Sequence, residues 1–158
     1  MPATEEEEAT MNEADIGTGL GYVRFAKEYM RKLGDKPYER EVIARLGDIL
    51  HKGSKSKGAI EALRYAIELE PMHKDAPSLQ NTIMSAYEGE RLFDEASKER
   101  DILVELYSEN TEWAKANRMN TKALREAGKL ARASLYKAAI FYHQQAIKYT
   151  DSGDLEKG

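Results

Sequence analysis

The chain has 158 residues, 41% hydrophobic and 33% charged, a length and balance that suit one ordinary domain with a thin core. Its longest apolar run is residues 138–142, far short of the roughly 20 residues that a membrane-spanning helix needs, and the acidic start predicts no secretory signal. Because the chain has no Cys and only three well-separated His residues, we expect no disulfide, metal site or cofactor.

The net charge of −4 is unevenly distributed along the chain. Residues 1–15 contain six acidic side chains and no Lys or Arg, so the rest of the chain carries +2. We expect residues 1–16 to form a disordered acidic leader and residues 151–158 a disordered tail. The near-neutral body lacks the clustered basic residues of nucleic-acid-binding proteins, so DNA and RNA are not expected partners.

Apolar side chains recur at steps of three and four residues from residue 20 onward, which predicts helices. Gly34 and Gly89 stop two of these helices, while Pro37 and Pro71 lie where a helix begins or ends. No segment alternates apolar and polar residues as a strand does, so no sheet is predicted. The predicted helices span residues 20–33, 37–51, 59–70, 76–88 and 93–107, followed by a short turn at 113–116 and a last helix at 121–149.

The last predicted helix contains one Gly and no Pro and would be ~43 Å long at ~1.5 Å per residue. The stripe expected to face the core consists of Leu124, Ala131, Leu135, Ala138, Tyr142, Ala146 and Tyr149. A second apolar side consists of Leu130, Ala133, Ile140 and Ile147. Because the end of a helical stack normally needs a polar cap, this second side predicts a surface for a partner, another repeat or a second subunit.

Residues 40–73 contain a pattern of eight positions, seven small or apolar residues and one proline stop. It reads Ile43-x-x-Leu46-Gly47-x-x-Leu50, then Ala59-x-x-x-Leu63-x-x-Ala66, then Pro71. This spacing resembles the tetratricopeptide repeat (TPR), with the usual residues at Leu46, Gly47, Ala59, Ala66 and Pro71. The small Gly47 and Ala59 allow two antiparallel helices to approach closely, and Pro71 cannot continue a helix.

A second, degenerate repeat covers residues 77–108 if Ala96 is matched to Ala59, 37 residues earlier. Met84 and Arg100 then replace a small and an apolar residue of the first repeat. The resemblance implies an all-α fold, a right-handed TPR-like α-solenoid of antiparallel helical hairpins that ends in the long C-terminal helix and occupies residues 17–150. The degeneracy also resembles the long TPR arrays of bacterial envelope and motility proteins, which would make this chain part of a larger protein.

TPR proteins bind extended or helical peptides in a concave groove lined by the first helix of each repeat. By position, the resemblance implies groove residues Glu41, Ala44, Asp48 and His51, followed by Ser78, Asn81, Ser85 and Glu88. Chaperone-binding TPRs clamp a C-terminal carboxylate with a Lys and an Asn, but the matching positions here hold Ala44 and Asp48. Asp48 would repel a carboxylate, so that kind of partner is not expected.

Two glycine-rich segments resemble phosphate-binding loops without matching them. Gly17-Thr-Gly-Leu-Gly21 has its third Gly one residue too early for a dinucleotide fingerprint, and the segment 53–58 lacks the Lys of a P-loop. We interpret the first as a flexible helix entrance and the second as a turn. His51 is interpreted as a solvated residue at a helix end and His143 as a structural residue.

The sequence therefore predicts a non-catalytic protein–protein interaction module, a scaffold or adaptor that binds a protein or peptide through the groove or the last helix and can self-associate through that helix. One alternative is a structural segment of a longer TPR array in a bacterial envelope complex, with no free groove. Another is a helical enzyme or ligand-binding domain around Tyr142, His143 and Tyr149, although no catalytic signature supports it. The expected compartment is the cytoplasm, or the periplasm for a piece of an envelope protein.

Overall fold

The computed structural model describes residues 13–34 and 36–151, and within these ranges it contains helices and turns but no strand. The all-α prediction is therefore confirmed for the described residues. None of the helices there is both long and apolar enough to cross a membrane. The helices are α2 (Glu13–Thr18), α3 (Leu20–Leu33), α4 (Glu39–Lys52), α5 (Ser56–Leu69), α6 (Ala76–Gly89), α7 (Phe93–Tyr107), α8 (Glu112–Ala116) and α9 (Thr121–Asp151).

The helix ends follow the glycine and proline signals closely. α3 ends before Gly34, whose φ of +83° suits glycine, and α5 ends two residues before Pro71. Pro77 lies in the first turn of α6, where its missing N–H has no helical partner to lose. α5 differs from its prediction because it begins at Ser56, three residues early, and so takes Gly58 into the helix.

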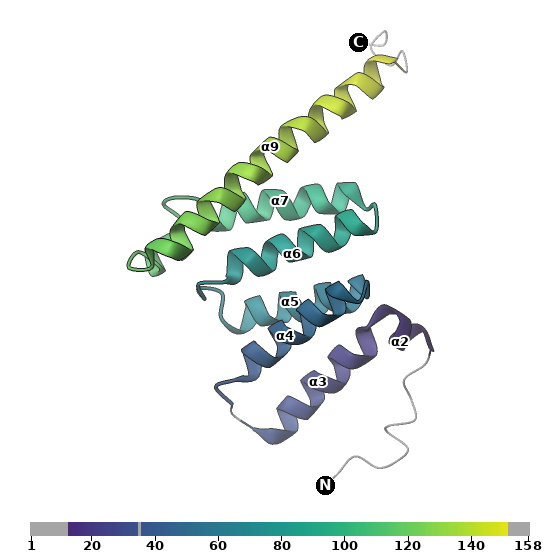
Figure 1. Cartoon of the computed structure of the whole chain (residues 1–158), viewed down its shortest axis with the longest axis vertical. Coiled ribbons are helices and arrows are strands. Elements are labelled where there is room, and N and C mark those ends of the chain that lie inside the picture. The colour runs from purple at the N-terminus through teal and green to yellow at the C-terminus, as the bar shows by residue number, and fades with distance from the viewer. Residues whose placement is uncertain (1–12, 35, 152–158) are drawn as a thin grey trace.

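Each helix packs mainly on its neighbours in sequence (Figure 1). α4 pairs with α5, α5 with α6, α6 with α7, and α7 with α9, while α3 packs on α5 and α4. The apolar side chains form two separate clusters along this series. The first is Val23, Ile43, Leu50, Ala59, Ala62 and Ala66. The second is Ala76, Leu103, Tyr107, Trp113, Ala127 and Ala131.

Gly47 permits the close pairing of α4 with α5. A Cβ atom at this position would lie 2.7 Å from Leu63 Cγ and 3.4 Å from Ala62 Cβ. The first of these distances is shorter than carbon atoms tolerate, so only glycine fits without a shift of the neighbouring side chain. The small residue therefore does here what the spacing analysis predicted.

The glycine-rich segment around Gly19 is a packed contact, which corrects its interpretation as a flexible entrance. Gly19 joins α2 to α3 with φ of +81°, and a Cβ atom on Gly58 would lie 2.5 Å from the Gly19 carbonyl carbon. Lys55 Nζ also donates to the Ile16 carbonyl oxygen at 2.9 Å. These contacts hold α2 in place, so residues 13–16 are helical rather than part of the predicted leader. The rest of the leader, residues 1–12, and the tail residues 152–158 lie outside the described residues.

α9 crosses α7 and then continues past the other helices (Figure 1). Its inner face consists of the buried Ala127, Ala131 and Ser134, followed by the half-buried Ala138 and Phe141. The predicted core stripe is thus wrong in its second half: Leu135, Tyr142 and Tyr149 are 55%, 56% and 61% exposed. The reason is that small residues let α9 approach α7 closely, whereas the C-terminal half of α9 extends beyond the helices that would cover it.

Candidate functional site

The predicted groove residues are divided between α4 and α6, which contact each other. Glu41 and Ser78 are exposed, and Ala44, Asp48, His51, Asn81, Ser85 and Glu88 are half-buried. On α4, Asp48 accepts a hydrogen bond from Lys52 Nζ at 2.7 Å, one helical turn away. On α6, Glu88 instead faces α9, so one end of the predicted groove belongs to a different site.

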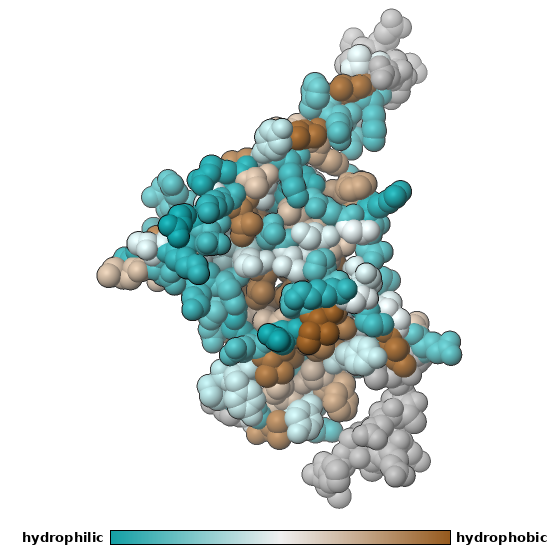
Figure 2. All heavy atoms as spheres, in the orientation of Figure 1, coloured by the Kyte–Doolittle hydropathy of each residue, from teal (hydrophilic) through white to brown (hydrophobic). Residues whose placement is uncertain are grey.

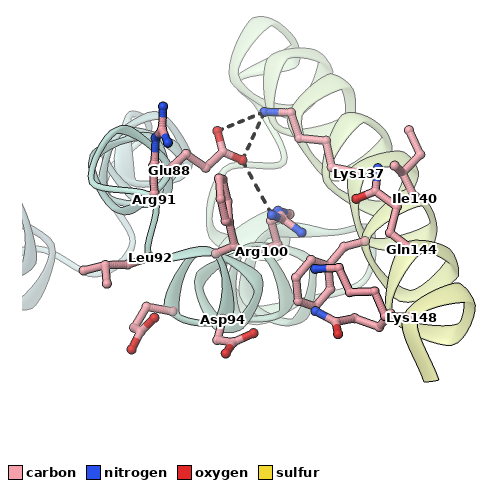
Figure 3. Close-up of a pocket in the computed structure, with 13 residues that line it drawn as sticks. Glu88, Arg91, Leu92, Asp94, Arg100, Lys137, Ile140, Gln144 and Lys148 are labelled. Atoms are coloured by element: carbon pink, nitrogen blue, oxygen red, sulfur yellow. Dashed lines mark hydrogen bonds and ion pairs between the residues drawn. The ribbon is translucent and has the colours of Figure 1, made fainter. Parts of the chain in front are cut away.

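That site is a cleft between the end of α6, the start of α7 and the second half of α9, which we call the α6–α9 cleft (Figure 3). Its volume is about 830 Å³, within the range of ligand sites in proteins. It brings together Glu88 of the predicted groove and Ile140 of the predicted partner surface. Of the other residues on that surface, Leu130 packs against the second core cluster, while Ala133 and Ile147 are exposed.

The turn between α6 and α7 places two apolar side chains at the mouth of the cleft. Arg91 has φ of +60°, and its N–H and that of Leu92 bond back to the carbonyl oxygens of Glu88 and Tyr87, both at 3.0 Å. This tight reversal leaves Leu92 and Phe93 about half exposed, at 46% and 50%. A partner with apolar side chains could therefore bury both residues.

Arg100 is the buried cation in the wall of this cleft, with only 4% of its surface exposed. Glu88 lies between two cations: its carboxylate is 3.6 Å from Arg100 Nη2 and 3.4 Å from Lys137 Nζ (Figure 3). The Arg100 guanidinium carbon lies 5.7 Å from the centre of the Phe141 ring, a cation–π distance. Arg100 Nε and Nη1 have no hydrogen-bond partner within the described part of the chain.

This arrangement follows from the departure of the second repeat from the first. Arg100 stands where the first repeat has Leu63, a buried apolar residue. A buried guanidinium requires compensation, which comes here from one carboxylate at the end of α6 and one aromatic ring of α9. The substitution at residue 100 is visible in the sequence, but its partners Glu88, Lys137 and Phe141 become apparent only in the structure.

Beyond the cleft, the second half of α9 exposes several large apolar and aromatic side chains. Figure 2 shows hydrophobic side chains at separate places along this projecting part of the molecule, with hydrophilic ones between them. No Asp or Glu occurs between Glu126 and Asp151, whereas this stretch contains four Lys or Arg residues. The large exposed side chains are Leu135, Tyr136, Ile140, Tyr142, Ile147 and Tyr149.

A polar clamp that the sequence analysis did not find joins α4, the α5–α6 turn and α8. The buried Arg40 forms an ion pair with Asp75, and His73 Nδ1 lies 2.6 Å from Asp75 Oδ1. Burial alone would raise the pKa of Asp75, but the hydrogen bonds from Arg40 and His73 outweigh it and hold the pKa below its ordinary value. Trp113 Nε1 donates to the His73 carbonyl oxygen at 2.8 Å, so the clamp extends to α8.

The described residues contain no cluster of His, Asp and Glu that could hold a metal ion. Tyr142, His143 and Tyr149 are exposed on α9 and do not line the α6–α9 cleft. The glycine-rich segment 53–58 is the α4–α5 turn and the first residues of α5.

No protein-family model, curated protein or solved structure gives a significant match to this chain. The geometry of the cleft and the exposed face of α9 are therefore the main guides to function.

Proposed function

We propose that this chain is a TPR-like, non-catalytic protein-interaction module that acts as a scaffold or adaptor. In this proposal the helices form a right-handed α-solenoid, and a protein or peptide partner binds along α9 and in the α6–α9 cleft. The observation that carries the proposal is the projecting half of α9, whose apolar side chains are uncovered beside a cleft of about 830 Å³. Exposed apolar surface of this extent on one element is typical of an interaction site.

The packing order supports a TPR-like arrangement. Successive helices pair with one another, Gly47 lies against Leu63, and Ala59 and Ala66 are fully buried in the first core cluster. These are the positions at which TPR hairpins place small residues. The helices of the first core cluster, α3, α4 and α5, pack chiefly on one another and on α6, as expected for an open series of hairpins rather than a closed bundle.

The chemistry of the cleft suits a peptide with mixed character. Leu92, Phe93 and Ile140 offer apolar surface at its mouth, while Asp94 and Lys148 in its lining offer charges of opposite sign besides the Glu88–Lys137 ion pair. Burial of half-exposed apolar side chains contributes about 25 cal/mol of binding free energy per Å². The charged groups favour one orientation of the bound peptide. We therefore place the partner site here rather than on Asp48 and His51 of α4.

The test uses a phage-displayed library of random peptides of about a dozen residues, selected on the immobilised protein. Selected peptides are then titrated by fluorescence anisotropy against the wild type, Ile140→Asp and Ile49→Asp. Ile49 is an equally apolar, 57% exposed residue of α4 and serves as the matched control. We expect Ile140→Asp to weaken binding by about tenfold or more, because a charge replaces a buried contact, and Ile49→Asp to leave it unchanged.

Circular dichroism of both variants shows whether they remain folded. Selection that yields no saturable peptide, or binding that Ile49→Asp weakens as much as Ile140→Asp, would contradict this function.

A second candidate function, a structural segment of a longer array, is favoured by the opposite end of the molecule. α3 also exposes an apolar stripe, with Phe25 and Tyr29 56% and 53% exposed and their rings stacked at 6.2 Å. Repeat ends with apolar faces stack on neighbouring repeats. Sedimentation equilibrium tests this alternative: head-to-tail association should disappear in both Phe25→Asp and Ile147→Asp, whereas a wild type that stays monomeric excludes self-stacking through these faces.

A further inference from the structure

A second cavity lies near the start of α9, facing the turn between α7 and α8. Its volume is about 590 Å³, and it shares no lining residue with the α6–α9 cleft. Its size is that of a small-molecule site rather than of a crevice between side chains.

The inner wall of this cavity is aromatic and firmly held. Tyr107 and Trp113 are 3% and 2% exposed, and their rings meet edge to face at 5.6 Å. Burial raises the pKa of Tyr107 to about 12, with Arg40 acting in the opposite direction, so the hydroxyl stays neutral at physiological pH. The clamp through Trp113 fixes this wall to the α5–α6 turn. The inner wall is therefore held in place by contacts within the chain.

Its outer wall is strongly basic. The lining includes Lys115, Arg118, Arg125 and Arg132, with Glu109 as the one carboxylate. Lys115 is engaged by Glu112 at 2.9 Å. The three guanidinium groups form neither an ion pair nor a hydrogen bond with any residue in the described ranges, and the surrounding part of α9 carries no acidic residue after Glu126.

Gly128 explains why the side chains of Arg125 and Arg132 line the same part of the cavity. Arg125 and Arg132 are two helical turns apart on one side of α9, and Gly128 lies between them with no side chain to fill the space. A Cβ atom on Gly128 would lie 3.4 Å from Arg132 Nη1, so the Arg132 guanidinium folds over the glycine. Three Arg side chains thus line one cavity in which Glu109 is the single carboxylate.

We infer that this cavity binds the phosphate group of a phosphate-bearing ligand. Phosphate offers several acceptor oxygens and up to two negative charges, which matches three unpaired guanidinium forks better than a carboxylate does. The half-buried Leu124 offers apolar surface against which the rest of the ligand would pack, while the buried Tyr107 and Trp113 form the floor of the cavity. The site is independent of the proposed peptide cleft, so either can exist without the other.

The test is an NMR titration of the full chain with inorganic phosphate, with sodium acetate at equal ionic strength as the comparison. We expect saturable shifts confined to residues 107–132 for phosphate and none that saturate for acetate. Arg125→Gln combined with Arg132→Gln should weaken phosphate binding by about tenfold or more, since each fork contributes a charge-assisted pair. The matched control is Arg45→Gln combined with Lys129→Gln, which removes the same charge from residues outside the cavity.

Gly128→Leu is a second variant that fills the hollow without changing any charge, and it should also abolish saturable binding. Equal weakening in the two charge variants would show general attraction and overturn the proposal, as would shifts that never saturate. Phosphatidic-acid vesicles then identify the source of the phosphate. If the protein sediments with the vesicles and free phosphate releases it, the ligand is a lipid headgroup. If the protein binds phosphate but not the vesicles, the ligand is a soluble phosphate ester.

Discussion

Asp75 shows how single polar residues tie this helical series together. It lies in the turn before α6 and accepts hydrogen bonds from Arg40 of α4 and from His73 of its own turn. Because Arg40 is only 7% exposed, it depends on this carboxylate for its charge compensation. One side chain thus joins α4 to the start of α6.

The lowered pKa of Asp75 predicts how stability depends on pH. A carboxylate whose pKa is lower in the folded than in the unfolded state stabilises the fold at any pH above its unfolded-state pKa, which is near 3.8. That stabilisation is lost as the pH falls through the folded-state pKa. Asp75→Asn should therefore lower the free energy of unfolding by about 1–2 kcal/mol at pH 7, a figure reduced for the partial exposure of Asp75. Denaturant melts from pH 7 down to about 2 should show this difference shrinking below pH 4.

Asp48→Asn provides the control, because within the described ranges Asp48 forms an ion pair with Lys52 alone, on the helix surface. Its effect should stay within about 0.5 kcal/mol at every pH. A difference for Asp75→Asn that does not change between pH 7 and pH 2 would show that the ion pair with Arg40 does not stabilise the fold.

At the scale of elements, the pairing of α4 with α5 depends on Gly47. A methyl group there would overlap Leu63, so Gly47→Ala should lower the free energy of unfolding by about 1–3 kcal/mol even though Ala is the better helix former. Gly89→Ala is the matched control, because a Cβ atom at residue 89 would have no atom of the described residues within 4 Å. Thermal melts should show Gly89→Ala at or above wild-type stability. Equal stability of the two variants would show that α4 and α5 do not need glycine to pair.

Local signals predicted most of the helices and the tightest hairpin. Gly34, Pro71 and Gly89 mark helix ends because their backbones limit what a helix can accept, and this does not depend on tertiary context. The buried face of α9, in contrast, was not predicted correctly in its second half. Periodicity selects the most hydrophobic stripe, which includes Leu135 and Tyr142, but packing on α7 selects the small Ala131 and Ser134.

The candidate sites were predictable only in fragments for a related reason. Glu88 and Ile140 were each singled out in the sequence, but their meeting depends on how α9 crosses α6 and α7. The basic cavity was missed because Arg118, Arg125 and Arg132 form no motif and the average charge of the body is close to neutral. Crossing angles and loop geometry arise from packing between elements, which one-dimensional patterns do not encode.

At the scale of the whole molecule, the two core clusters predict local rather than global responses to a core defect. Ile43 and Leu103 are fully buried, one in each cluster, and truncation of either to Ala should cost about 2–5 kcal/mol. In a series of helices that contact mainly their neighbours, that loss acts first on the damaged part. Amide hydrogen exchange should therefore accelerate most in α3–α5 for Ile43→Ala and most in α6–α9 for Leu103→Ala.

The links between the clusters determine how far each effect spreads. α5 packs on α6, Arg64 of α5 forms an ion pair with Glu99 of α7, and Gln80 donates to the same carboxylate at 2.6 Å. Glu99→Gln keeps the shape of this link and removes its charge. The double variant Ile43→Ala with Glu99→Gln should therefore show a smaller increase of amide exchange in α6–α9 than Ile43→Ala alone. If both core variants instead accelerate exchange uniformly along the chain, the helices unfold as one closed unit, because only an open series confines the damage to one end.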